Sequence, residues 1–283
     1  MKTWSKLFLV VFLGLYGSGC AHIPYRYGYS IERRDTLPLR PNEPQFERGQ
    51  PNVVVDSLGN VFGVLSKIIL WNWKVDRHYI SPETETALQL YLGTNDLRNV
   101  KVRLNQYSPG NEWSRLFRNK AVGAGWRYTV GFLDVLLYTI LPGRLFGGDE
   151  YSPYSNTINL YSDIPAIGIQ QGGFAKDLAK KRYKGTYAFF HSFPVAFLFV
   201  EARATGDAIS YLRTEGTAEE EKAGYKILYP AFGMSIGGTW VKRAGPTKGI
   251  YAVLVIPGHI IGRIKASGVE ERRAEHPDPS GKW

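Results

Sequence analysis

Apolar residues recur at helical spacing along much of the chain. Leu58, Val61, Leu65 and Ile68 fall on one side of a helix, and folding is expected to begin near Val53. Periodicity, together with capping residues, glycines and prolines, predicts further helices over residues 81–93, 112–119, 132–141, 163–183 and 187–212.

Strand patterns are fewer and shorter. One stretch alternates apolar with polar residues and predicts a half-buried strand: Val100, Lys101, Val102, Arg103, Leu104 and Asn105. Residues 144–146 and 157–161 flank a connection rich in glycine and proline and predict a hairpin. The expected fold class is α+β, with a mainly helical domain around a small antiparallel sheet.

Two late apolar runs, 227–241 and 249–262, are uncharged, and each contains two glycines four residues apart. Such glycines allow close contact between helices in membranes. However, both runs are shorter than the roughly 18 residues needed to span a bilayer, and each contains a proline. The pattern therefore favours a pair of buried helices.

The N-terminus has the pattern of a secretion signal. Basic residues up to Lys6 precede an apolar run, Leu7–Leu15, that is too short to cross a membrane. Small residues then lead to Cys20, and this segment resembles the lipobox of bacterial lipoproteins, although Gly17 stands where leucine is usual. The resemblance implies a lipidated Cys20 and, because Ala21 follows it, an outer-membrane lipoprotein facing the periplasm. The alternative is ordinary cleavage that leaves a free thiol.

Amino-acid composition indicates how the rest of the chain is divided into segments. We expect a signal peptide over 1–19, a tether rich in proline and arginine over 20–52, one domain over 53–266 and a polar tail over 267–283. A net charge of +10 favours anionic envelope lipids or polymers as partners. A protein partner is a separate expectation. No nucleic-acid motif is present. The single cysteine excludes internal disulfides and zinc clusters built from cysteines.

One segment suggests a specific fold. Residues 156–177 predict a strand followed by a helix capped by Ser162 or Asp163, with Gly172 and Gly173 in the helix interior. This frame resembles the active-site helix of zincin metallopeptidases of the gluzincin kind, whose signature is H-E-x-x-H. The five signature positions fall on Gln170, Gln171, Gly172, Gly173 and Phe174.

The resemblance also implies a third zinc ligand on a later helix, at Glu201, with Asp207 as the next candidate. Zinc requires two imidazoles one helical turn apart, which Gln170 and Phe174 do not supply. Gln171 cannot take a proton from a metal-bound water as glutamate does. The sequence therefore predicts a degenerate site with no catalytic residue, no metal and no cofactor, in a protein that binds or scaffolds.

Two other functions remain open. Ser235 lies in a G-x-S-x-G motif, the nucleophile elbow of α/β-hydrolases. That mechanism needs an acid and then a histidine, yet no acid lies between Ser235 and His259, so a helix face of small residues is favoured. The alternatives are an active envelope hydrolase, with Ser235 as nucleophile or a metal near Glu201 and Asp207, and a structural membrane-associated protein.

Overall fold

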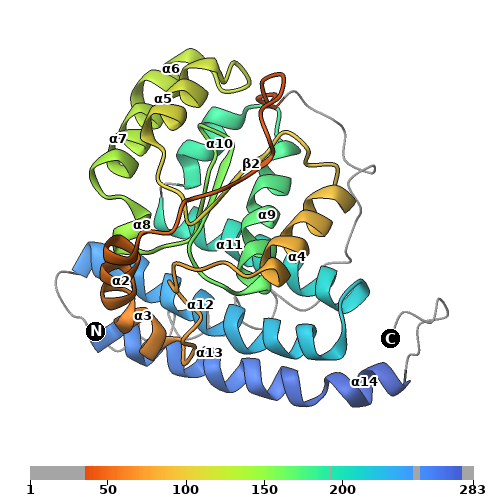
Figure 1. Cartoon of the computed structure of the whole chain (residues 1–283). Helices are drawn as coiled ribbons and strands as arrows, with labels where there is room; N and C mark the ends of the chain where they lie inside the picture. The colour runs from red at the N-terminus through yellow and green to blue at the C-terminus, as the bar shows by residue number, and fades with distance from the viewer. Residues whose placement is uncertain (1–35, 192, 245–248, 276–283) are drawn as a thin grey trace. The chain divides into compact units, whose positions relative to one another are not determined.

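The computed structural model describes residues 36–191, 193–244 and 249–275 (Figure 1). The chain divides into two compact units, the first ending at Ala196 and the second beginning at Phe197. The sequence predicts one domain over 53–266 and does not indicate this division. The class is mixed α and β, mainly helical with one small sheet, as expected.

The sheet lies in the first unit and has the order β1 (Phe46–Arg48), β2 (Lys101–Leu104), β4 (Thr157–Leu160), β3 (Glu150–Ser152). The pairs β1–β2 and β2–β4 are parallel, and only β3 is antiparallel to its neighbour β4. The expected antiparallel sheet is therefore wrong, because helical crossovers bring these strands together in parallel. β1 also shows that part of the expected tether is folded.

One face of the sheet is apolar and carries the main core. Val102, Leu104, Ile158 and Leu160 are fully buried there. This face is covered by α4 (Pro82–Thr94) and α9 (Pro165–Ala179), which pack against each other. Their predicted starts are close to those observed, since Ser81 caps α4 and prolines occupy the first turns of both helices.

The helices between β2 and β3 form a second core. They are α5 (Pro109–Arg118), α6 (Ala124–Trp126), the short π-helix η2 (Arg127–Gly131), α7 (Phe132–Ile140) and α8 (Gly143–Phe146). α7 matches the predicted helix that Pro142 stops. The core of this region consists of Leu116, Val122, Val135, Tyr154 and Ala188.

Several predicted boundaries are wrong. Residues 144–146 belong to α8, and β3 and β4 form the hairpin instead. α9 ends at Ala179, before the predicted end at 183. Residues 187–212 are divided between α10 (Lys184–His191) and α11 (Pro194–Thr214), with Pro194 at the start of the second helix.

The predicted amphipathic helix from Val53 is also divided, into α2 (Val53–Phe62) and α3 (Val64–Ile69). Its apolar side faces solvent, whereas Gly59, Gly63 and Lys67 face the interior. This orientation is the reverse of an ordinary surface helix.

The second unit contains α11, α12 (Ala218–Ala244), α13 (Gly249–Ser267) and α14 (Val269–Glu275). α12 and α13 pack closely, as predicted, and a side chain at Gly258 or Gly262 would lie 2.5 Å from a backbone oxygen of α12. Within the described ranges, no helix is long and apolar enough to cross a membrane. α14 lies in the expected polar tail, and its Arg272 and Arg273 pair with the fully buried Glu221 of α12 (2.6 and 2.9 Å).

Candidate functional site

Helix α9 carries the five positions that the sequence compares with a zinc-peptidase signature. Its N-cap is Ile164, which makes no side-chain cap, so the predicted cap by Asp163 or Ser162 is wrong. Asp163 Oδ1 instead accepts hydrogen bonds from the Ser81 hydroxyl (2.6 Å) and the Thr84 hydroxyl (2.8 Å). Burial alone would raise the pKa of Asp163, but these bonds lower it. The carboxylate thereby joins the first turn of α4 to the start of α9.

The signature positions lie in the interior of the first unit. Gln170 and Gln171 are only 5% and 6% exposed, Gly172 and Gly173 are buried, and Phe174 is half-buried. A Cβ atom at Gly172 would lie 2.6 Å from two carbons of the Tyr91 ring on α4. Close packing of α4 on α9 therefore accounts for glycine at this position.

The edge strand β3 borders this helix. β3 pairs with β4 on one side and contacts α9. In the described part of the chain, its backbone makes hydrogen bonds only with β4. Glu150 is exposed on this strand, whereas Ser152 is buried. Among the described residues, the other backbone edge of β3 is therefore unpaired, and the strand lies against α9.

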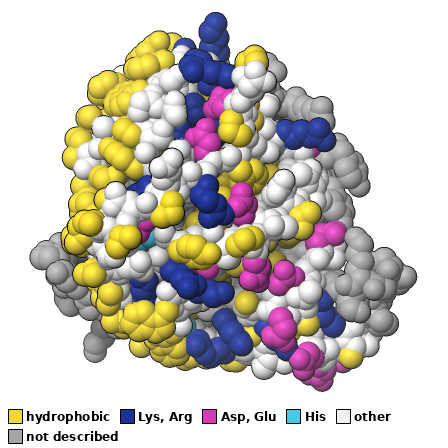
Figure 2. All heavy atoms as spheres, viewed as in Figure 1, with side chains coloured by type: hydrophobic (Ala, Val, Ile, Leu, Met, Phe, Trp, Pro, Cys, Tyr) yellow, Lys and Arg dark blue, Asp and Glu magenta, His cyan; other side chains and the backbone are white. Residues whose placement is uncertain are grey.

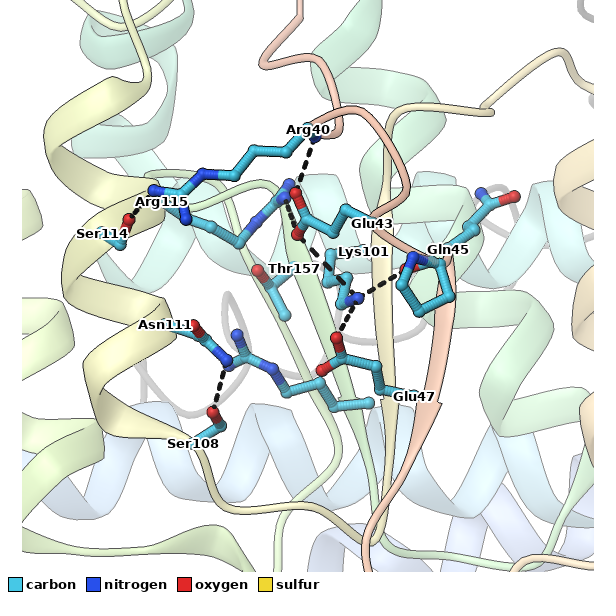
Figure 3. Close-up of polar contacts among 12 residues, drawn as sticks. Arg40, Glu43, Gln45, Glu47, Lys101, Ser108, Asn111, Ser114, Arg115 and Thr157 are labelled. Carbon is cyan, nitrogen blue, oxygen red and sulfur yellow. Dashed lines mark hydrogen bonds and ion pairs between the residues drawn. The ribbon is translucent and has the colours of Figure 1, made fainter.

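The second face of the sheet is polar but buried, so the predicted half-buried strand is wrong in this respect. Lys101 and Arg103 on β2 are 1% and 0% exposed. The Lys101 ammonium lies 2.6 Å from Glu47, and Arg115 of α5 pairs with Glu43 (3.1 Å; Figure 3). These ion pairs explain how the charges tolerate burial.

A group of carboxyls lies where this polar face meets β3. Burial, and then the charge of Glu112, raise the pKa of Asp134 to about 6, although a hydrogen bond from Ser152 (2.7 Å) lowers it. Glu150 keeps some contact with solvent, but neighbouring protein atoms remove much of the water around its carboxyl. This desolvation, and then the charges of Asp134 and Glu112, raise the pKa of Glu150 to about 8. The nearby polar amide of Asn159 opposes this rise in pKa, although its distance and angle to Glu150 are not those of an ordinary hydrogen bond.

Sequence reasoning missed this group. Its residues come from α5, α7, β3 and β4, and the only local signal is the acidic pair Asp149-Glu150 after two glycines. Asn159 and Arg103 each keep buried nitrogen atoms without a partner. The arrangement can hold protons near neutral pH, because like charges and burial stabilise the acid forms.

In the second unit, the structure brings together two residues that the sequence treats as separate alternatives. The Ser235 hydroxyl of α12 donates a 2.7 Å hydrogen bond to Glu201 Oε1 of α11. Glu201 is only 5% exposed, and its Oε2 atom has no hydrogen-bond partner. Burial raises the pKa of Glu201 to about 8, although the bond from Ser235 lowers it.

The other candidate residues are dispersed. Asp207 is half-buried on α11, six positions after Glu201. His259 is buried on α13 beside Arg263, and Cys20 lies outside the described residues. Among residues 36–191, 193–244 and 249–275, no group of three or more His, Cys, Asp or Glu side chains is placed to hold a metal ion.

Comparison of the chain with protein-family models, with curated proteins and with solved structures finds no match.

Proposed function

We propose that this chain is a non-catalytic, peptide-binding protein of the bacterial cell envelope, built on a frame that resembles a zinc peptidase. The observation that carries the proposal is the free edge of β3 beside α9. An extended peptide adds readily to such an edge, because backbone hydrogen bonds supply affinity without requiring one sequence.

The signature positions on α9 support binding without cleavage. Gln170 and Phe174 stand where a peptidase of this kind has its zinc-binding imidazoles. Gln171 has an amide where catalysis needs a carboxylate. On this proposal, α9 keeps the position of a peptidase helix next to β3 but lacks the groups that bind zinc and activate water.

The test uses the full chain with Cys20→Ser and a tryptic digest of casein as the peptide source. Peptides that co-elute are identified by mass spectrometry, and hydrogen exchange follows the amides of residues 150–152. We expect bound, uncleaved peptides and slower exchange at β3, with unchanged exchange in the middle of α4. Cleavage of the peptides would contradict the proposal, as would unchanged β3 exchange at saturating peptide.

The proposed location rests on the N-terminal segment. Lipidation of Cys20 would place the protein at the outer membrane, facing the periplasm, with anionic envelope lipids near its basic tether. Mass spectrometry of the N-terminal peptide from bacterial membranes tests this directly. We expect Cys20 to carry fatty acyl chains, palmitate among them. An unmodified Cys20, or cleavage at another position, would refute the anchor.

The 2.7 Å bond between Ser235 and Glu201 favours one second candidate, a hydrolase in which Glu201 accepts the serine proton. A fluorophosphonate probe distinguishes the two functions. Labelling that disappears in Ser235→Ala would favour the hydrolase, whereas an unlabelled wild-type chain would exclude it as a serine hydrolase of this kind.

A further inference from the structure

The first unit exposes many apolar side chains on four helices, α2, α3, α7 and α8, which we call the apolar face. Each is between 47% and 68% exposed. Hydrophobic side chains gather along the edge of the unit where α7, α8 and α2 lie (Figure 2). The members are Val54, Leu58, Val61, Phe62, Leu65, Ile68, Leu133, Leu137, Ile140 and Phe146.

The apolar face is continuous across elements that are distant in sequence. The rings of Phe62 on α2 and Phe146 on α8 lie 5.5 Å apart, centroid to centroid. α2 packs along α8, and α8 follows α7 after only two residues, so the exposed end of α7 adjoins α2. A continuous apolar surface of this extent marks an interaction site in a soluble unit.

The inward side of α2 and α3 shows why the apolar residues point outward. A Cβ atom at Gly59 would lie 2.6 Å from His78 Nε2, and one at Gly63 would lie 2.6 Å from Asp76 Cβ. The buried Lys67 ammonium donates to the backbone oxygen of Asn60 (2.9 Å). Small and polar residues therefore fix the inner side, and rotation to bury the apolar side would break these contacts.

Charge and aromatic residues indicate what covers this face. Segments 53–75 and 120–146 contain five basic residues and two acidic ones. Both acids have partners in the fold, since Asp56 pairs with Arg144 (2.9 Å) and Asp134 accepts from Ser152. Arg144 is neutralised by Asp56 and Lys67 is buried, so Lys74, Lys120 and the partly exposed Arg127 remain to complement anionic lipid headgroups.

Exposed aromatic residues with polar atoms lie at the ends of the same helices. Trp71 and Trp73, directly after α3, are 63% and 70% exposed, and Tyr128, just before α7, is 57% exposed. Tryptophan and tyrosine are enriched at the level of lipid headgroups. Amphipathic helices with such residues lie in the membrane interface, with their apolar side about 5–10 Å deep.

We propose that the apolar face inserts into the surface of a bilayer that contains anionic phospholipid. This contact is separate from the proposed acyl anchor at Cys20 and from peptide binding at β3. It would hold the first unit against the membrane by α2, α3, α7 and α8.

The experiment removes the acyl anchor and varies the apolar face. The full chain with Cys20→Ser is floated with vesicles of phosphatidylcholine alone, or of phosphatidylcholine and phosphatidylglycerol in equal parts. A second variant adds Val61→Ser, Leu65→Gln and Ile68→Gln, three changes at exposed positions. The matched control adds Leu90→Gln instead, at a 59% exposed position on α4, which covers the sheet.

We expect the Cys20→Ser chain and the Leu90→Gln control to float with the phosphatidylglycerol vesicles. The variant with three changes should bind at least tenfold more weakly, because it loses three large apolar groups from the surface that enters the bilayer. Equal binding by all three proteins, or no binding by any, would overturn the proposal. A Cys20→Ser dimer that the three changes dissociate, without vesicle binding, would assign the face to a second copy and also overturn it.

Discussion

Gly172 of α9 lies so close to Tyr91 of α4 that a Cβ atom would stand 2.6 Å from two carbons of the tyrosine ring. Tyr91 is fully buried, so its ring has little room to move. The interior glycine, which costs about 1 kcal/mol of helix stability relative to alanine, is thus required by the packing of two helices.

This contact gives the first prediction. Gly172→Ala should lower the free energy of unfolding by about 1–3 kcal/mol, because overpacking outweighs the gain in helix propensity. Gly168→Ala on the same helix is the matched control, since its Cβ atom would meet Leu160 and Leu88 at 3.6 Å, an ordinary contact. The control should be neutral or stabilising by up to about 1 kcal/mol in urea unfolding. Equal effects at both positions would show that Tyr91 does not constrain Gly172.

The second prediction concerns the buried ion pair between Arg103 and Glu112. Glu112→Ala leaves a fully buried guanidinium without its carboxylate and should destabilise the first unit by about 3–5 kcal/mol. Glu85→Ala removes a partner of Arg48, whose side chain is 44% exposed, and should cost at most about 1 kcal/mol. Chemical unfolding of both variants checks the contrast. A small loss in Glu112→Ala would mean that water or another carboxylate reaches Arg103.

The third prediction concerns pH. The pKa of Glu201 is about 8 in the folded chain and near 4.5 when unfolded. Between these values only the folded state holds the proton, so this group's contribution to the free energy of unfolding falls as pH rises. Glu201→Gln stays neutral and can still accept from Ser235. It should therefore raise stability at about pH 9, on the order of 3 kcal/mol, and change it little at about pH 5.

Thermal unfolding at both pH values provides the measurement for Glu201→Gln. Glu219→Gln is the control, because the Glu219 side chain is 83% exposed. The control should shift stability equally, and slightly, at both pH values. A Glu201→Gln variant with the same pH profile as wild type would show that Glu201 is not a protonated buried acid.

Local signals in the sequence predict the elements around α9 well. Ser81 and Pro82 mark the start of α4, and Pro142 marks the end of α7. These features depend on nearby residues, so periodicity and capping suffice to identify them. The parallel pairing of β2 with β4 is not predictable in this way, because residues 105–156, which run through five helices and β3, separate the two strands in sequence.

The missed features arise from contacts distant in sequence. Alternation on β2 predicts a solvated side for Arg103, but α5 brings Glu112 over it. Ser235 and Glu201 are 34 positions apart, and neither has a local pattern that indicates the other. Helical spacing finds the apolar side of α2 but not its direction, which the inward contacts of Gly59 and Lys67 determine.

We propose that α9 is the helix of a zinc-peptidase frame whose chemical groups have been replaced. Restoring them tests it most directly: Gln170→His, Gln171→Glu and Phe174→His together recreate two imidazoles one helical turn apart. Loss of packing at Phe174 costs about 1–3 kcal/mol, which zinc binding would offset.

The measurement is zinc affinity by titration calorimetry, with thermal unfolding to show that each variant folds. We expect the restored variant to bind zinc stoichiometrically and the wild type to bind none. A restored variant that folds but binds zinc no better than wild type would contradict the peptidase frame. Gly172 would then be only a packing contact between α4 and α9.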